Sequence, residues 1–165
     1  MLEAVRCHGN VLSFASDELR ADREVVLEAV KETGDALVHA GPVMKDNMSI
    51  VLHAVARDGE ALAFASTRFR SDRTVALVAV RQTGMALRRV GENLRGDREI
   101  VLQAVRQNGR ALQYANEELR DNLEVILAAL HQTPEALEFV GPLHRDKNIV
   151  LLVRRSTDGE EPSGR

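Results

Sequence analysis

The sequence has few aromatic residues, a single cysteine and no long apolar run. Phe, Trp and Tyr together make up 3% of its 165 residues, and Trp is missing altogether. A β-sandwich draws on aromatic and β-branched side chains, so a core made largely of Leu, Val and Ala favours closely packed helices. Since Cys7 has no second cysteine to pair with, an intramolecular disulfide is excluded and a reducing compartment is expected.

Targeting signals are missing as well. No stretch approaches the ~18 apolar residues of a membrane-spanning helix. The first residues carry acidic side chains and no apolar run of signal-peptide length. We therefore expect a cytoplasmic protein, with the nucleus as the alternative. A net charge of -3 argues against nucleic acid as the main partner, because phosphate binding needs clustered positive charge.

The chain is instead dominated by a repeat of 25 residues that has no gap or insertion. A leucine marks the first half of every copy, at Leu2, Leu27, Leu52, Leu77, Leu102, Leu127 and Leu152. A glycine marks the middle of the first five copies, at Gly9, Gly34, Gly59, Gly84 and Gly109, and Pro134 replaces it in the sixth. In-register repetition of this kind is typical of stacked repeat proteins.

Each copy predicts two short helices. The first begins after an Asp or Asn whose side chain can cap it, at Asp22, Asn47, Asp72, Asp97 and Asn122. We expect the glycine that follows this helix, such as Gly34, to end it in a left-handed conformation. The second helix is expected directly after the glycine. In the even copies a further glycine shortens it, at Gly41, Gly91 and Gly141, to one or two turns of possible 3₁₀ character.

A second period of 50 residues is superimposed on the first. The odd copies carry Phe14, Phe64 and Tyr114, whereas the even copies carry the additional glycines. The pattern predicts an all-α solenoid of six 25-residue helix-turn-helix repeats, grouped as three 50-residue blocks, plus a terminal half repeat. Residues 1–155 are expected to form this repeat domain, and residues 156–165 a disordered tail.

The first copy lacks a cap, because Met1 falls in the middle of its first helix. We expect this end to expose Leu2 and Val5, as in a piece of a longer array or a chain that self-associates through this end. A larger multidomain protein whose activity lies elsewhere is a related alternative.

The strings VLQAVRQNGRALQYANEELRDN and VLEAVKETGDALVHAG resemble the tandem repeats grouped as domain of unknown function 4116, with the pattern VLxAVxxNGxALxxAxxELRxD. The resemblance covers residues 1–153 and implies short helical repeats, and it provides no activity, ligand or partner that could be transferred to residues of this chain. The even copies depart from the pattern, with Thr–Gly in place of Asn–Gly. The architecture is also similar to that of leucine-rich repeat variants, which alternate an α-helix with a 3₁₀ helix.

One repeat position carries a positive charge in every copy, and we call these residues the basic ladder. Its members are Arg20, Lys45, Arg70, Arg95, Arg120 and Arg145. Stacked copies would align them as a stripe able to bind a polyanion such as nucleic acid, a phospholipid headgroup or an acidic peptide. The favoured interpretation is structural: each cation ends a helix, where the dipole favours it, and can pair with the capping acid, as Arg20 with Asp22 or Arg70 with Asp72.

No catalytic, metal or cofactor site is predicted. The histidines His8, His39, His53, His131 and His144 occupy five different repeat positions and show no zinc-ligand spacing. Cys7 aligns with polar residues and is expected to be exposed, with no oriented base beside it. We therefore expect a non-catalytic module or spacer that binds a protein or peptide.

Overall fold

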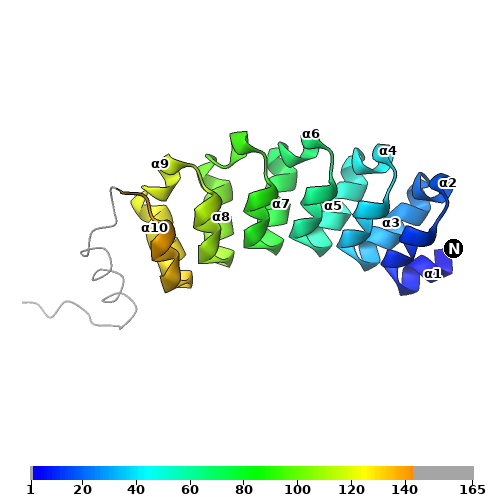
Figure 1. Cartoon of the computed structure of the whole chain (residues 1–165), viewed down its shortest axis with the longest axis horizontal. Helices are drawn as coiled ribbons and strands as arrows, with labels where there is room; N and C mark the ends of the chain where they lie inside the picture. The colour runs from blue at the N-terminus through cyan, green and yellow to red at the C-terminus, as the bar shows by residue number, and fades with distance from the viewer. Residues whose placement is uncertain (1, 143–165) are drawn as a thin grey trace, which may run out of the picture.

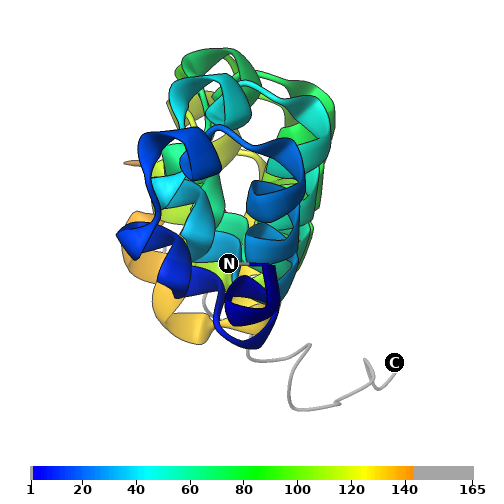
Figure 2. The same ribbon diagram turned by 90° about the vertical axis from the view of Figure 1, so that its right-hand side faces the viewer.

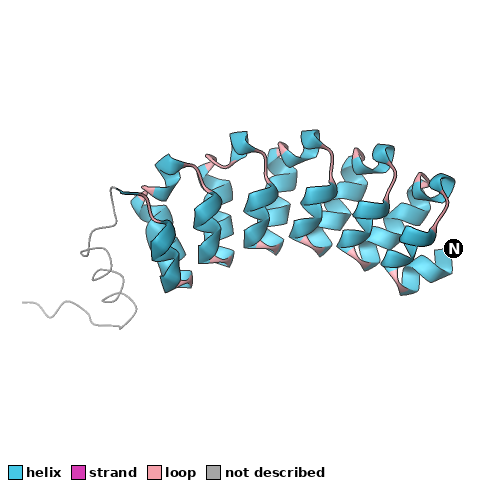
Figure 3. Cartoon of the chain, viewed as in Figure 1, coloured by secondary structure: helices cyan, strands magenta, loops and turns pink. Residues whose placement is uncertain are grey.

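The computed structural model describes residues 2–142 and shows an elongated row of helical units (Figure 1). Within this range no strand is present, and the segments between helices are short (Figure 3). We number the units by the repeat, so that unit 1 ends at residue 21 and units 2 to 6 begin at residues 22, 47, 72, 97 and 122. The all-α repeat fold predicted from the sequence is thereby confirmed.

Units 1 to 5 each contain three helical segments where two were predicted. A long α-helix comes first: α1 Leu2–Cys7, α3 Arg23–Glu32, α5 Met48–Arg57, α7 Arg73–Gln82, α8 Arg98–Gln107 and α10 Leu123–Gln132. A 3₁₀ helix follows: η1 Gly9–Phe14, η2 Gly34–His39, η3 Gly59–Phe64, η4 Gly84–Arg89, η6 Gly109–Tyr114 and η7 Pro134–Phe139. A single short turn closes five of the units: α2 Asp17–Arg20, α4 Pro42–Lys45, α6 Thr67–Arg70, η5 Glu92–Leu94 and α9 Glu117–Arg120.

The predicted N-caps of the long helices are confirmed. The Asp22 carboxylate accepts a hydrogen bond from the backbone N–H of Val25 at 3.0 Å, and the Asn47 side chain accepts one from Ile50 at 3.3 Å. Asp72, Asp97 and Asn122 cap their helices in the same way. These bonds satisfy backbone donors that have no partner inside the helix.

The predicted role of the central glycines is wrong. None of them adopts the left-handed conformation, and α3 ends at Thr33 in an extended conformation, with φ -139 and ψ 113. Gly34 instead begins η2, and a Cβ placed on it would lie 2.6 Å from the carbonyl oxygen of Ala54 in the next unit. Glycine is required there because the backbone of the neighbouring unit comes too close for a side chain.

The predicted continuous second helix of the odd units is also wrong. In unit 3 the segment Gly59–Phe64 is 3₁₀, Ala65 is extended, and a separate helix begins at Thr67. The even units break at the equivalent place, as at Ala40. Every unit therefore turns at the same point, whether or not a glycine follows.

Two layers enclose the core. The long helices pack against one another in sequence order, and so do the 3₁₀ helices. Each long helix also contacts the 3₁₀ helices of its own unit and of the preceding unit, as α5 contacts η3 and η2. Figure 2 looks along the array from unit 1 and shows the helices stacked behind one another.

The apolar seam between the layers is continuous. Residues at equivalent positions of units 2 to 5 are fully buried, for example Val51, Ala54 and Val55 of α5 with Leu62 of η3. No polar or charged residue is buried within the described range. Because a short helix has little stability alone, this shared seam holds the units together.

The expected exposure at the first unit is wrong for one residue and weaker than expected for the other. Val5 is fully buried and Leu2 is half-buried. Phe14 is the large apolar side chain exposed there, at 87%, whereas the equivalent Phe64 is half-buried. The expected half repeat near residue 146, the tail at 156–165, His144 and Arg145 lie outside the described residues.

Candidate functional site

The basic ladder lies along the edge formed by the short helices, which is the upper edge in Figure 1. Four of its members are the last residues of short helices: Arg20 of α2, Lys45 of α4, Arg70 of α6 and Arg120 of α9. Arg95 directly follows η5. The predicted position of each cation at a helix end is therefore correct for the described members.

Three of the ladder side chains bind backbone carbonyls of their own units. Arg20 Nη2 donates to the carbonyl of Ser13 at 2.7 Å, and Lys45 Nζ donates to that of Val38 at 2.7 Å. Arg95 Nη2 donates to the carbonyl of Arg88 at 2.9 Å. In each case the acceptor lies seven residues earlier, near the end of the 3₁₀ helix, where carbonyls lack helical partners.

The predicted pairing of ladder cations with capping acids is wrong. Asp22 and Asp72 cap their helices through the N–H groups of Val25 and Val75. Arg20 instead lies 4.0 Å from Asp17, and Arg70 Nη2 donates to the Thr67 hydroxyl. Contacts within the same unit, rather than the cap of the following helix, therefore orient Arg20 and Arg70.

The backbone of the ladder residues joins successive units. The carbonyl of Arg20 accepts the N–H of Gly41 at 2.8 Å, and that of Lys45 accepts the N–H of Ser66 at 3.1 Å. The same bond recurs from Gly91 to Arg70, from Asn116 to Arg95 and from Gly141 to Arg120. The ladder position is thus part of the framework of the array.

Some of the ladder's hydrogen-bonding capacity is left unused. The Nε atoms of Arg20, Arg70 and Arg120 are buried and have no hydrogen-bond partner. In unit 4, by contrast, Arg95 Nε donates to the carbonyl of Val90 at 3.1 Å. The unpartnered donors therefore occur in units 1, 3 and 5.

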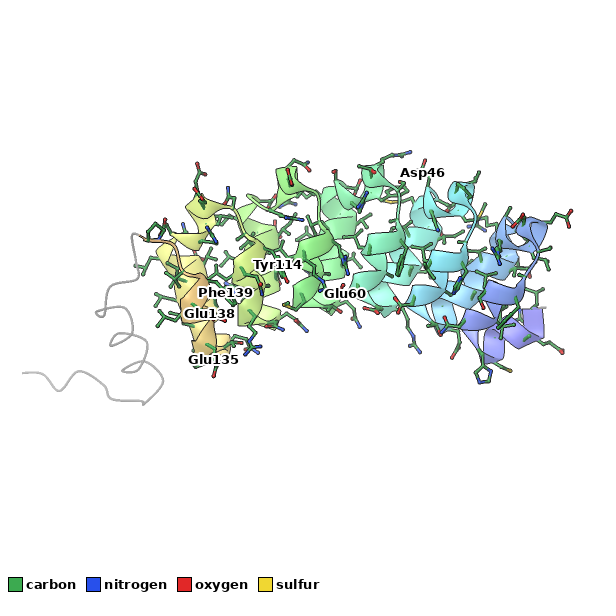
Figure 4. All side chains as sticks on the ribbon, viewed as in Figure 1. Asp46, Glu60, Tyr114, Glu135, Glu138 and Phe139 are labelled. Carbon is green, nitrogen blue, oxygen red and sulfur yellow. The ribbon has the colours of Figure 1, made fainter. Side chains whose placement is uncertain are left out.

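A charged cluster lies on the layer of 3₁₀ helices, where Glu60 of η3 meets Arg88 and Arg89 of η4. Glu60 accepts bonds from Arg88 Nη2 at 2.8 Å and from Arg89 Nε at 3.1 Å. Partial burial acts to raise the pKa of Glu60, but the bonds from the two arginines outweigh it and lower the pKa. The bond with Glu60 raises the pKa of Arg88, so the pair stays ionised. Figure 4 shows Glu60 and Tyr114 on the same face of the array.

A surface pocket of about 430 Å³ adjoins this cluster, between α6 and η4. Arg70, Arg88, Arg89 and Arg95 line it, and we call it the arginine pocket. Its other lining residues are Ala63, Thr67, Ser71, Val90, Gly91, Glu92 and Asn93. The pocket thus brings together two ladder residues, Arg70 and Arg95, and the pair Arg88 and Arg89. Other residues occupy the positions of this pair in the other described copies.

An equivalent pocket of about 330 Å³ lies 50 residues earlier, between α2 and η2. It contains Arg20 and Lys45, but Val38 and His39 stand where the arginine pocket has Arg88 and Arg89. The two pockets share a backbone framework and differ in charge.

A third polar group lies on the layer of long helices. Arg73 contacts Asp97 at 2.8 Å and also pairs with Glu99. Burial acts to raise the pKa of Asp97. The bonds from Arg73 and from the backbone N–H groups at the start of α8 outweigh burial, and the net effect lowers the pKa. Because Arg73 and Glu99 are each half exposed, this group serves to link units 4 and 5 weakly.

The remaining sequence candidates do not converge. Cys7 is exposed, as predicted. Residues 2–142 contain no group of three or more His, Cys, Asp or Glu side chains with the spacing of a metal site. His53 contacts the carbonyl of Ser49 in its own helix.

Sequence reasoning missed the cluster of Glu60, Arg88 and Arg89. The residue types at these three positions differ between copies, so the positions do not appear in the repeat pattern, which contains only residues that the copies share. The available signal was the Arg–Arg pair that only the fourth copy carries at this position. Its proximity to Glu60, 28 residues away, depends on how the units stack.

Comparison with known proteins identifies the repeat. The chain matches the domain of unknown function DUF4116 three times, at residues 1–45, 47–95 and 97–145. The matches follow the 50-residue blocks. No curated protein and no solved structure matches the chain. In the part that the structure describes, no helix combines the length and apolar character needed to cross a membrane.

Proposed function

Because the chain belongs to the family of the domain of unknown function DUF4116, whose name states no activity, we propose a function from the geometry: a non-catalytic module that binds an extended segment of a partner protein along its 3₁₀ helices. We use "3₁₀ face" for the surface made by the last two residues of each 3₁₀ helix. These are Ser13, Phe14, Val38, His39, Ala63, Phe64, Arg88, Arg89, Gln113, Tyr114, Glu138 and Phe139.

The observation that carries the proposal is a division of roles among the repeat positions. Positions that the copies share are occupied by core residues, helix caps, close-packed glycines or ladder cations. In the 3₁₀ face, the first residue of each pair differs from unit to unit in charge, size and polarity, and the second is aromatic in units 1, 3, 5 and 6. A stacked repeat presents such variable positions side by side, which suits recognition of one particular partner.

The side chains of the 3₁₀ face also suit a protein partner. Phe64, Tyr114 and Phe139 are half-buried beside exposed or half-exposed polar residues. Aromatic and arginine side chains are enriched where proteins meet, because each combines a large apolar area with a directed polar group. Successive 3₁₀ helices contact one another, so the face extends along the array without interruption.

The test is selection from a random peptide display library against the folded array, followed by two variants with equal changes of charge. Ala63→Glu with Gln113→Glu alters the 3₁₀ face, and Glu138 already occupies the equivalent position in unit 6. His53→Glu with Gln103→Glu alters the layer of long helices. Glu28 already occupies the equivalent position in unit 2. We expect selected peptides to bind the second variant normally and the first at least about tenfold more weakly.

Failure to select any peptide would contradict the proposal. So would peptides that lose affinity for the His53/Gln103 variant and keep it for the Ala63/Gln113 variant, since the long helices would then carry the binding surface. Circular dichroism and the melting temperature of both variants check that the fold is retained. Self-association through unit 1 is a separate proposal, and Phe14 is the exposed apolar residue through which it would act.

A further inference from the structure

We propose that the arginine pocket binds the phosphoryl group of a phosphorylated serine or threonine within such a partner segment. This inference rests on the proposed function and specifies one contact within it. The pocket lies where the 3₁₀ face meets the edge of short helices, so a segment following the face passes it.

The first argument is charge. Arg70, Arg88, Arg89 and Arg95 bring four positive charges to the pocket, and Glu92 in its lining and Glu60 beside it compensate two of them. Two positive charges are left. A phosphorylated side chain carries about -1.5 to -2 charges at pH 7 and matches that balance.

The second argument is the supply of hydrogen-bond donors. The bonds to Glu60 use Nε and Nη2 of Arg88 and Nε of Arg89, so Nη1 of Arg88 and both Nη groups of Arg89 take no part in them. A guanidinium presents a planar fork of N–H donors that fits phosphate oxygens in pairs.

The third argument is room beside the polar groups. A Cβ on Gly91 would overlap the Ser71 hydroxyl oxygen and lie 2.8 Å from Oδ1 of Asn93. Glycine at this position therefore leaves the side chains of Ser71 and Asn93 in place in the pocket lining. Both are polar and can complete the coordination of an oxyanion.

The fourth argument is that the charge is local. In the first block Val38 and His39 replace the two arginines, and in the third block Glu138 and Phe139 do so. A surface that binds nucleic acid or an anionic membrane needs positive charge spread over many positions. Here the Arg88–Arg89 pair adds to the ladder cations in one pocket only, in a chain with net charge -3, which favours a single phosphoryl group.

The experiment uses a degenerate peptide library with a fixed central phosphoserine, a matched library with serine, inorganic phosphate, and vesicles of phosphatidylcholine that contain phosphatidylinositol 4-phosphate. Binding is measured to the full chain and to two variants. Arg88→Val with Arg89→His installs the residues of the first block, whose fold is the same. Glu60→Gln removes the carboxylate that shares the arginines.

We expect the phosphoserine library to bind at least about tenfold more tightly than the serine library, because charge-assisted bonds to phosphate are strong. The Arg88/Arg89 variant should abolish this difference while keeping the circular dichroism spectrum of the folded chain. Glu60→Gln should increase phosphopeptide affinity about threefold or more, since it removes a competing negative charge. If Arg88 and Arg89 served only to stabilise the fold, Glu60→Gln would not increase the affinity for phosphopeptides.

Three results would overturn the inference. Equal binding of both libraries would leave the proposed function standing without a phosphoryl pocket. Binding of vesicles without binding of phosphopeptides would identify a headgroup site instead. A phosphopeptide preference that survives in the Arg88/Arg89 variant would place the phosphoryl group elsewhere. If neither library binds, the proposed function fails together with the inference.

Discussion

Two close contacts of the backbone between successive units differ in the groups they bring together. At the start of the 3₁₀ helix that follows the long helix in units 1 to 5, a glycine faces a backbone carbonyl of the next unit, and a Cβ placed on Gly59 would overlap the carbonyl oxygen of Ala79. We call this the glycine joint. At the edge of short helices, a ladder carbonyl accepts an N–H of the next unit, and the flanking groups are side chains. We call this the edge joint.

The comparison explains the two periods of the sequence. A backbone carbonyl is the same in every residue, so the glycine joint demands glycine in units 1 to 5 and repeats every 25 residues. Side chains at the edge joint compensate for one another: Ser66 bonds to Asp46 at 2.6 Å, whereas Gly91 leaves room for Ser71. Alternating solutions are allowed there, and the period becomes 50 residues.

The largest expected effect comes from breaking the glycine joint. Gly59→Ala should destabilise the array by about 3 kcal/mol, because the new methyl group meets a backbone carbonyl that cannot move without shifting the next unit. Chemical denaturation of the full chain measures this loss. The control is Gly41→Ala at an edge joint, where the nearest atom is the carbonyl oxygen of Arg20 at 3.2 Å.

Gly41→Ala should cost about 1 kcal/mol or less, because alanine also lowers the entropy of the unfolded chain. Equal losses for the two variants would contradict the distinction between the joints. The comparison holds only if both proteins unfold in a single transition, which coincidence of fluorescence and circular dichroism curves establishes.

Exchanging residues across one edge joint is the next test. Gly91→Ser alone places a side chain against the Ser71 hydroxyl and should destabilise the chain by about 1–2 kcal/mol. Adding Ser71→Gly reproduces the arrangement of Gly96 with Asn116 and should recover about 1 kcal/mol of that loss. A double-mutant cycle of unfolding free energies measures the coupling. Strictly additive losses would mean that the two positions do not compensate.

Much of the framework follows from the sequence, because its causes are local. The caps at Asp22 and Asn47 and the buried stripe of α5 depend on residues within one helix, and all were predicted. The identity of the repeat was predicted for the same reason, since six aligned copies show which positions must be apolar.

The predictions that failed concern contacts between units. Ala61, Leu62, Ala65 and Phe69 have the spacing of one helix, yet the chain turns at Ala65 because Ser66 donates its N–H to Lys45 of the preceding unit. Gly34 was expected to end a helix, but its neighbour across the joint determines its role. Repeat spacing does not reveal which groups of adjacent units approach each other.

The ladder gives a smaller effect, because its main contribution to the edge joint is a backbone carbonyl. Arg20→Ala with Lys45→Ala keeps those carbonyls and removes the side-chain bonds to Ser13 and Val38. We expect a loss of about 1 kcal/mol in thermal or chemical unfolding, since each side chain remains partly exposed. Retention on heparin at low salt should be unchanged. A steep loss of retention would instead support the alternative of a ladder that binds polyanions.

The smallest expected effect concerns Asp35 and Glu60, two acidic residues at the same repeat position of units 2 and 3. Neither residue takes part in the glycine joint or the edge joint. Arg88 and Arg89 overcome the effect of burial and lower the pKa of Glu60, whereas burial, with Asp58 and Glu60 nearby, raises the pKa of Asp35. A lowered pKa in the folded state stabilises the protein above the unfolded pKa, and this contribution is lost as pH falls through the folded pKa. A raised pKa has the opposite sign: ionised Asp35 opposes folding at neutral pH, and that penalty disappears in acid.

Glu60→Gln should therefore lower stability at pH 7 and flatten the loss of stability between about pH 5 and pH 3. Asp35→Asn should raise stability at pH 7 and make the loss of stability in acid steeper. In the unchanged chain, protonation of Asp35 stabilises the folded state as the pH falls, and the variant lacks this contribution. Each change is expected to be about 0.5 kcal/mol, in view of the partial exposure of both groups. Urea unfolding at a series of pH values measures both slopes. If the two variants shift the profile in the same direction, the arginines of η4 do not distinguish unit 3 from unit 2.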